Sequence, residues 1–137
     1  MLDKILFGSK AIEKSLDASL KRNEVIAQNI ANVDTPGYNR KTVSFEEQLS
    51  DAISQKSGFI GKRTDPRHIP IGGSSVDDVQ IKVSEDKNSL DMRLDGNNVD
   101  IENEMAQMAE NNIRYEVLIQ RMSGMLNRMR SVIREGR

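Results

Sequence analysis

The chain contains 137 residues, which is the usual length of one modest domain. Only 36% of its residues are hydrophobic and 4% are aromatic, so its three Phe and two Tyr side chains cannot anchor a large globular core. Twenty basic residues oppose 21 acidic residues, and the formal net charge is −1. This balance argues against a nucleic-acid-binding protein, which needs a concentrated positive surface.

The residue types that carry catalysis and metal binding are scarce. The lack of Cys excludes disulfides, thiolate zinc sites, iron–sulfur clusters and a cysteine nucleophile. The single His, His68, excludes the two-His zinc helix and the paired Glu-x-x-His motifs of di-iron bundles. It lies in a polar segment without a candidate nucleophile, and the glycines of Gly58–Lys62 are too close together for a phosphate-binding loop. We therefore predict that the protein is not an enzyme and has no catalytic residue, cofactor, metal ion or small-molecule substrate.

The sequence also lacks a conventional membrane or secretion signal. No segment approaches the run of about 18 apolar residues that a membrane span requires. Asp3, Lys4 and Lys10 interrupt the first ten residues, which therefore do not form the apolar core of a cleaved secretory signal. We expect the protein to stay in the cytoplasm or to leave it by a route that reads another signal.

The N-terminal segment, residues 1–35, predicts a long amphipathic helix over about residues 3–33. Apolar residues recur at alternating spacings of three and four, as they do along one face of a helix. This stripe contains Leu2, Ile5, Ile12, Leu16, Ile26, Ile30 and Val33. Pro36 and Gly37 end the helix, because proline cannot continue the backbone hydrogen-bond ladder.

The middle segment, residues 36–98, is polar and contains all three prolines. Apolar and polar residues alternate from Val79 to Val83 and again from Leu90 to Leu94, which is typical of half-buried strands. We therefore predict a β-hairpin or small sheet near residues 76–94 and a loop over residues 54–75.

The C-terminal segment, residues 99–137, has the strongest helical pattern, over about residues 100–134. Asp100 is the predicted N-cap, and the arginines near the C-terminal end suit the helix dipole. Asn112 is the one polar residue in the stripe; it either pairs with a polar partner and fixes the register or lies at a solvent-facing edge. The stripe contains Ile101, Met105, Met108, Asn112, Tyr115, Ile119, Met122, Leu126, Met129 and Ile133.

The two long helices together predict a mainly α fold. Their lengths, roughly 45 Å and 50 Å, match. We therefore predict that they pair as a coiled-coil hairpin, with a small irregular or β-hairpin middle segment. The apolar stripe of the C-terminal helix covers three of every seven positions, which is more than one partner helix buries.

The excess apolar surface predicts assembly with other subunits. We expect a row of Leu118, Met125 and Val132 to stay exposed on the monomer, and the ends of the isolated chain to be poorly ordered until neighbours cover them. The Met residues of the row and stripe suit either an ordinary core or contacts with non-identical partners. The predicted assembly interface is Ile12, Leu16, Ile26, Ile30, Met108, Tyr115, Ile119, Met122, Leu126 and Met129.

One motif is much more specific than these patterns. Residues 29–38 read Asn-Ile-Ala-Asn-Val-Asp-Thr-Pro-Gly-Tyr, at the end of the first predicted helix. This motif closely resembles the signature of the flagellar rod and hook family, the axial proteins of the bacterial flagellum. Amide side chains suit the free carbonyls of a last helical turn, and tyrosine offers an apolar ring with a polar tip. The signature residues are Asn29, Ala31, Asn32, Thr35, Pro36, Gly37 and Tyr38.

Further segments extend the resemblance to about two thirds of the chain. They are Phe45–Leu49, Arg67–Ile69 and Arg93–Asp100, which leads into the C-terminal helix. Together with the short length, they are most similar to a small protein of the proximal rod. The small rod protein FlgC is the nearest alternative. A cytoplasmic coiled-coil adaptor or chaperone, and an enzyme of unfamiliar design in the middle segment, are alternatives from other classes.

The resemblance implies a structural role in the basal body. It implies a subunit that assembles helically through its terminal helices, links the inner-membrane ring to the drive shaft and transmits torque across the periplasm for motility. The implied partners are other copies of the chain, the rod proteins FlgC, FlgF and FliE, the inner-membrane ring and the flagellar type III export apparatus. Such proteins are exported unfolded, without a cleaved signal peptide.

Overall fold

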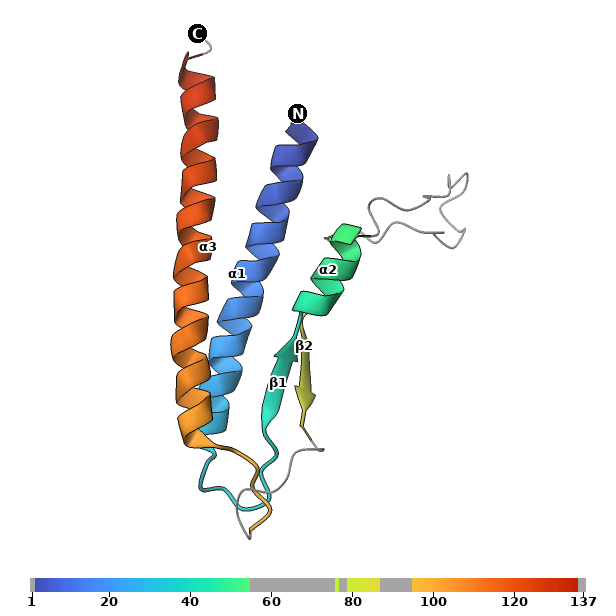
Figure 1. Cartoon of the computed structure of the whole chain (residues 1–137), viewed down its shortest axis with the longest axis vertical. Coiled ribbons are helices and arrows are strands. Elements are labelled where there is room, and N and C mark those ends of the chain that lie inside the picture. Colours follow the sequence, from blue (N-terminus) through green and yellow to red (C-terminus); the bar gives the residue numbers. More distant parts are fainter. Residues whose placement is uncertain (1, 55–75, 77–78, 87–94, 136–137) are drawn as a thin grey trace, which may run out of the picture.

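The computed structural model describes residues 2–54, 76, 79–86 and 95–135. It confirms the predicted mainly α fold with long helices at both ends and a small sheet between them (Figure 1). The elements in chain order are α1 (Leu2–Ala31), β1 (Lys41–Ser44), α2 (Glu46–Ser54), β2 (Lys82–Glu85) and α3 (Ile101–Glu135).

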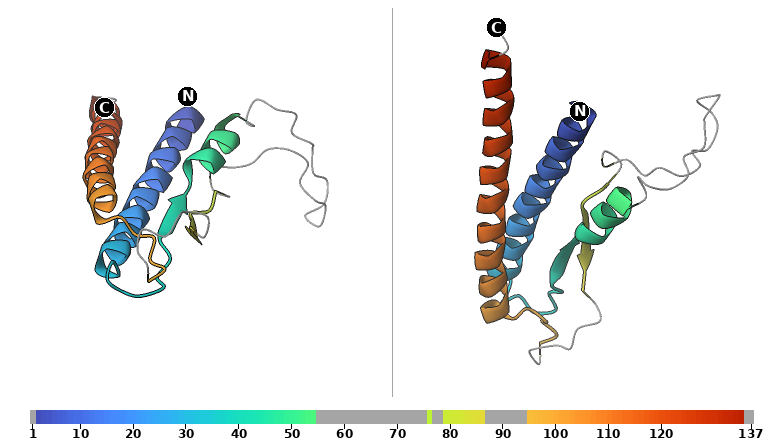
Figure 2. Two further views of the ribbon diagram at one scale, coloured as in Figure 1. Left: turned by 60° about the horizontal axis from the view of Figure 1, so that its bottom comes forward. Right: turned by 45° about the horizontal axis from the view of Figure 1, so that its top comes forward.

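Helices α1 and α3 form an antiparallel hairpin, with both chain ends at the same end of the molecule (Figure 1). Their 30 and 35 residues correspond to about 45 Å and 52 Å at 1.5 Å per residue. The two helices lie closest near the end where the chain leaves α1 and enters α3, and they diverge toward the termini (Figures 1 and 2). We call the closely packed end the base of the hairpin and the other end its far end.

The contact line of α3 with α1 differs by one residue from the predicted stripe. Asn111 is buried and bonds to α1, and the Met125 methyl lies 3.4 Å from the place of a Cβ at Gly8. Ile119 and Leu126, predicted to face α1, are instead exposed. The row expected to stay exposed is therefore partly used within the monomer: Leu118 and Met125 are half-buried, and only Val132 is exposed. A stripe three positions wide allows either choice, and the buried amide of Asn111 decides between them.

The other flank of α1 is covered by α2 and the sheet, so α1 is the middle element of the molecule (Figure 2). The core on this flank is small. Its buried members are Ala18, Phe45, Ala52 and Val79, with Leu49 and Ile81 packed against it. Because α2 has nine residues and could not form a stable helix alone, this packing on α1 is what holds it.

Strands β1 and β2 form a two-stranded antiparallel sheet in which Thr42 lies opposite Ser84 and Val43 opposite Val83. The sequence predicted a strand near β2 but neither β1 nor α2. The second predicted strand, from Leu90 to Leu94, lies outside the described residues, as do His68 and all of the predicted loop 54–75 except Ser54, which ends α2. The short sequence Lys-Thr-Val-Ser of β1 contains one apolar residue, so it carries no visible alternation.

Within the described residues, no helix combines the length and apolar character needed to cross a membrane. The same part of the chain brings no three His, Cys, Asp or Glu side chains together as metal ligands.

Candidate functional site

The signature motif occupies the exit of α1 at the base of the hairpin. After Ala31 the chain continues in tight turns, with Asn32 N donating to Gln28 O and Thr35 N donating to Asn32 O at 3.0 Å. The Asn32 side chain also donates to Gln28 O, at 2.8 Å. It therefore satisfies a free carbonyl of the last turn, which is the role that the sequence suggested for these amides.

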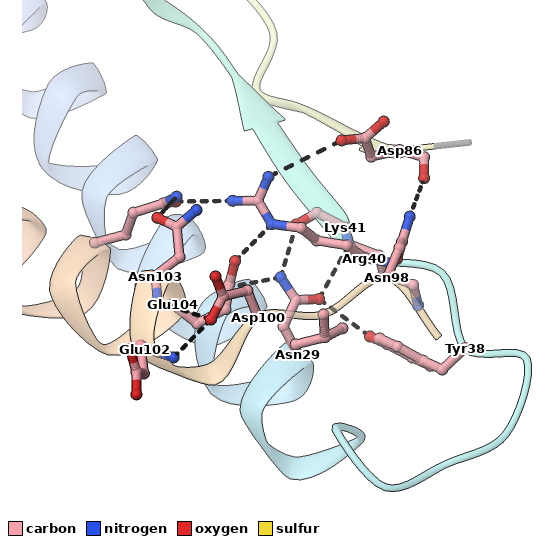
Figure 3. A network of polar contacts seen from close by, with 12 residues as sticks. Asn29, Tyr38, Arg40, Lys41, Asp86, Asn98, Asp100, Glu102, Asn103 and Glu104 are labelled. Carbon is pink, nitrogen blue, oxygen red and sulfur yellow. Dashed lines mark hydrogen bonds and ion pairs between the residues drawn. The ribbon is translucent and has the colours of Figure 1, made fainter. Parts of the chain in front are cut away.

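Asn29 is the centre of a buried hydrogen-bond network at this exit (Figure 3). Its side chain is fully buried and makes four hydrogen bonds, which is all that an amide side chain can make. Nδ2 donates to Lys41 O and to Glu104 Oε2, both at 2.9 Å. Oδ1 accepts from Lys41 N at 3.0 Å and from the Tyr38 hydroxyl at 3.3 Å. One residue thus ties α1 to β1, to α3 and to the end of its own motif.

The protonation state of Tyr38 suits this donor role. Burial raises the pKa of the phenol, and the nearby negative charges of Glu104 and Glu85 raise it further. The hydroxyl therefore keeps its proton and can donate to Asn29 Oδ1 throughout the neutral pH range.

The Arg40–Glu104 ion pair connects β1 to the first turn of α3. Arg40 Nε lies 2.5 Å from Glu104 Oε1, and the Glu104 side chain is 1% exposed. Arg40 Nη2 donates to Gln107 Oε1 at 3.0 Å, so the guanidinium spans one turn of α3. Both oxygens of Glu104 have donors, since Asn29 binds the second. This complete pairing is what makes a buried carboxylate tolerable.

Asn97 and Asn98 connect the segment before α3 to both other parts of the base. The fully buried Asn97 points Nδ2 at the carbonyls of Asn32, Val33 and Thr35, at distances of 2.9, 3.0 and 2.9 Å. These are the carbonyls that follow the end of α1, so Asn97 caps that helix from a distant part of the chain. Asn98 accepts from Arg40 N at 2.6 Å and donates to Asp86 O at 2.7 Å.

Two glycines allow the chain to make these turns. Gly37 and Gly96 have φ angles of +68° and +79°, in the left-handed region that favours glycine. Gly37 N donates to Asp95 O at 2.9 Å, so the two turns are directly joined. After them, Asp100 caps α3 as predicted, with Oδ1 accepting from Glu102 N at 3.0 Å and from Asn103 N at 3.3 Å.

We call Asn29, Tyr38, Arg40, Asn97, Asn98 and Glu104 the base network. Its polar groups are directed at one another and at the backbone, which suits positioning of the two long helices. The remaining signature residues lie at its edge: Ala31, Thr35, Pro36 and Gly37 are exposed, and Thr35 Oγ1 donates to Asn32 Oδ1 at 3.2 Å.

The residues of the predicted assembly interface differ in how far the monomer buries their side chains. Ile26 is buried, and Ile119 and Leu126 are exposed. The half-buried residues are Ile12, Leu16, Ile30, Met108, Tyr115, Met122 and Met129. Eight of the ten predicted residues are therefore at least partly buried within the monomer, and the other two, Ile119 and Leu126, are exposed on its surface.

A second feature is a groove in which α1 forms the floor and α2 and α3 the walls. Its volume is about 360 Å³, and its apolar part is lined by Ala18, Phe45, Leu49, Ile113, Val117 and Leu118. We call it the three-helix groove. Arg22 and Arg114 lie at its polar end on either side of Glu46, with Arg22 Nη2 at 2.6 Å from Glu46 Oε1 and Arg114 Nη1 at 3.8 Å. Burial alone would raise the pKa of Glu46, but a backbone hydrogen bond and the two arginines outweigh it and lower the pKa.

Sequence reasoning singled out Asn29 and Tyr38 but missed most of their partners. Arg40 follows the signature by two residues, and neither it nor Glu104 was singled out from the sequence. A useful signal was present in its spacing: Glu104 precedes Met108 and Asn111 by four and seven residues, so it lies on the face of α3 that packs on α1. A carboxylate on such a face requires a cationic partner.

Comparison with known proteins gives a consistent result over nearly the whole chain. A family profile described as flagella basal body rod protein matches residues 15–39, which include the signature. The chain is 35% identical over 126 residues to the flagellar basal body rod protein FlgB of Bacillus subtilis, covering 92% of each chain. Identity over 142 residues is 30% to FlgB of Escherichia coli and 29% to FlgB of Salmonella typhimurium, covering 99% of each chain.

Proposed function

The chain belongs to the FlgB family of flagellar basal body rod proteins, and from this premise we propose how its structure serves the rod. It is a structural subunit of the bacterial flagellar basal body. We propose that α1 and α3 pack side by side with the helices of neighbouring subunits in a helical tube, and that this tube links the inner-membrane ring to the drive shaft and transmits torque.

The observation that carries this proposal is the apolar surface of α3. Of the eleven large hydrophobic residues that are exposed in the described part of the chain, eight lie on this one helix. A monomeric soluble protein rarely exposes so much apolar surface on one element, because its burial is favourable. The eight are Ile101, Met105, Ile113, Val117, Ile119, Leu126, Val132 and Ile133.

The base network supports the same role from the other end. A torque-bearing subunit needs a fixed angle between its helices and its middle segment. Buried, fully paired polar groups fix such an angle better than apolar contacts do, because hydrogen bonds are directional. We therefore assign residues 1–35 and 99–137 to the axial part of the tube, and residues 36–98 to a segment held at a set angle by the base network.

The position within the cell follows from the same proposal. The subunit would act in the periplasm-spanning rod, next to FlgC, FlgF, FliE, the inner-membrane ring and copies of itself. The flagellar export apparatus would deliver it there unfolded, without a cleaved signal peptide. Its contribution would be mechanical, with no catalysis, and a cytoplasmic adaptor with the same helices would not co-purify with basal bodies.

The test replaces Leu126 by Asp in a strain whose only copy of the gene carries the change. We expect loss of swimming and loss of the chain from purified basal bodies, because assembly would bury an unpaired charge. The exposed neighbour Asn127→Asp is the matched control and should assemble, since it adds the same charge at a polar position. Circular dichroism should show equal helix content for both purified variants. Normal swimming of the Leu126→Asp strain would contradict the proposal.

A further inference from the structure

Helix α3 exposes apolar side chains on two opposite sides. On one side, Met105, Ile119, Leu126 and Ile133 are 59%, 40%, 48% and 76% exposed. They lie at sevenfold spacing, with Asn112 filling the gap between Met105 and Ile119. We call these five residues the α3 row. At about 100° per residue, Ile119 lies about 160° around the helix axis from Val117, which lines the three-helix groove.

The groove offers an apolar site of suitable size for such a row. Ile113 and Val117 on its α3 wall are 65% and 51% exposed, and Phe45 and Leu49 form the facing wall beside α2. Figure 1 shows that α1 runs between α3 and α2, and α1 contributes Ser15, Ala18, Ser19 and Arg22 to the lining of the groove. The row and the groove lie on different flanks of α3: Asn112 of the row bonds to Asn23 of α1, while Ile113 and Val117 line the groove on the other flank.

A polar pocket next to the polar end of the groove contains a buried acceptor that has no donor among the described residues. Asn111 is 2% exposed, and its Nδ2 donates to Ser19 O and to Asn23 Oδ1, both at 2.8 Å. Its Oδ1 has no hydrogen-bond partner among the described residues. Asn111 lines a second, polar pocket, which shares Arg22, Glu46 and Arg114 with the lining of the three-helix groove and so adjoins it. A buried carbonyl oxygen without a donor is unfavourable, which indicates that a donor arrives with a bound partner.

We propose that the three-helix groove binds the α3 row of a second copy of this chain, with the two α3 helices parallel and without a shift along their axes. This inference rests on the proposed function and names the contact through which neighbouring subunits pack. The spacing selects the register. Leu118 of the groove and Asn111 of the adjoining polar pocket are seven residues apart, as are Ile119 and Asn112 of the row. Seven helical residues correspond to about 10.5 Å in both cases.

In this register, Ile119 of the second copy fills the apolar part of the groove while the Asn112 amide reaches the level of Asn111 Oδ1. An antiparallel arrangement would bring an apolar residue, Leu126, to that oxygen and leave it without a donor. The charges agree with the parallel arrangement. The polar end of the groove carries two arginines and one glutamate, Arg22, Arg114 and Glu46, and Glu116 lies next to Ile119 on the row side of α3.

The opposite placement of row and groove makes the contact head-to-tail. A subunit that has bound a neighbour through its groove still presents its row, so the association continues beyond a dimer. A contact with twofold symmetry would use the same surface on both copies and would stop at two subunits.

The test disables each surface separately in the purified full-length chain. Val117→Glu places a charge in the groove, and Ile119→Glu places one in the row. Val83→Glu on strand β2 is the matched control, because Val83 is 42% exposed and lies outside both surfaces. Sedimentation velocity over a concentration series should show self-association of the parent chain and of Val83→Glu, weakened about tenfold or more in each of the other two variants.

Mixing the two disabled variants separates head-to-tail from symmetric contact. An equimolar mixture of Val117→Glu and Ile119→Glu retains one intact groove and one intact row, so we expect a 1:1 dimer and nothing larger. A mixture that stays as monomeric as its components, or single variants that associate like the parent, would overturn the proposal.

A cross-link inside basal bodies gives a second readout that does not depend on association in solution. The chain has no Cys, so Leu49→Cys and Ile119→Cys provide the only thiols. With both in one chain, a short thiol-reactive cross-linker should yield a ladder of dimers, trimers and larger species, while either single variant yields none beyond dimers. If the double variant is present in basal bodies but gives no ladder, the groove contact alone is contradicted. If the unmodified chain is absent from basal bodies, the proposed function is contradicted instead.

Discussion

The base and the far end of the α1–α3 hairpin are stabilised by opposite kinds of contact. At the base, Asn29, Asn97 and Glu104 are fully buried, and each bonds to a segment distant in sequence. At the far end, the two helices diverge and Val132 and Ile133 are 72% and 76% exposed. The comparison indicates that the monomer uses its directional polar bonds to set one geometry and leaves its non-directional apolar surface for association.

This division has a physical reason. Buried polar groups are tolerated only in arrangements that satisfy nearly all of them, so they select one geometry strongly. Apolar surface contributes in proportion to the area that is buried and accepts partners of different shape. Met122, Met125 and Met129 on the far part of α3 add side chains that adapt readily to different neighbours.

The strongest test of the comparison is amide hydrogen exchange on the dilute, isolated chain. We expect amides of α1 and α3 near Asn29 and Glu104 to exchange about a thousandfold or more slowly than those near Gly8 and Val132, because the two helices diverge and pack less closely at the far end. Equal protection along both helices would break the comparison, since it would mean that the far end is stable without neighbours.

The next largest effect is expected from Glu104→Ala. It leaves the largely buried Arg40 guanidinium with only the longer ion pair to Asp86, at 4.0 Å, and removes a partner of Asn29, so we expect a loss of about 3 kcal/mol in the free energy of unfolding. Urea unfolding followed by circular dichroism measures it. Glu102→Ala is the control: it removes the same charge type from the same helical turn, at an exposed position, and should cost about 1 kcal/mol or less. Equal losses of stability in both variants would mean that Glu104 acts only through the helix dipole and that its bonds to Arg40 and Asn29 do not stabilise the fold.

A smaller effect is expected from Asn97→Ala, which removes the amide that caps the carbonyls after α1. Losing the bonds of this buried amide to Asn32 O, Val33 O and Thr35 O should cost about 1–3 kcal/mol in the same urea assay. The exposed Asn127→Ala should stay within about 0.5 kcal/mol of the parent chain. If both changes were neutral, water would satisfy the end of α1 as well as Asn97 does.

The smallest effect is expected from Tyr38→Phe, about 0.5–1.5 kcal/mol, because Lys41 N still donates to Asn29 Oδ1. The pKa of Tyr38 is raised above its ordinary value of 10.0. Its contribution to stability is therefore present below that pH and is lost as pH rises through the higher folded-state pKa. In a Tyr115→Phe chain, whose only phenol is Tyr38, the phenolate absorbance should rise with a midpoint above 10.0. A midpoint at or below that value would contradict the burial of the hydroxyl at the base.

The sequence predicted the long helices well because their apolar periodicity extends over 30 and 35 residues. It did not predict α2 and β1, whose nine and four residues carry too little pattern and are held by packing on α1 and β2. It also did not predict the base network as a unit. Arg40 and Asn29 reach Glu104 across 64 and 75 residues of sequence, and no spacing rule connects positions so far apart.

The one-residue difference on α3 has a related cause. Asn111 and Asn112 are adjacent, and the apolar periodicity alone favours placing Asn111 outside and the neighbouring stripe inside. The bonds from Asn111 Nδ2 to Ser19 O and Asn23 Oδ1 reverse that preference, and Asn23 also donates to Asn112 Oδ1 at 2.9 Å. Asn112 is therefore both hydrogen-bonded and at a solvent-facing edge, which joins the two alternatives that the pattern left open.

The long reach of the base network also affects the order in which the molecule can mature. A chain that emerges from a narrow conduit one end first presents Asn29 and Arg40 long before, or long after, Glu104 and Asn97. Closing such a wide loop is entropically costly and slow, so the angle at the base is set only when nearly the whole polypeptide has arrived. A chain that ends before Asn97 and Glu104 therefore cannot form the base of the hairpin, and it could not replace a complete subunit.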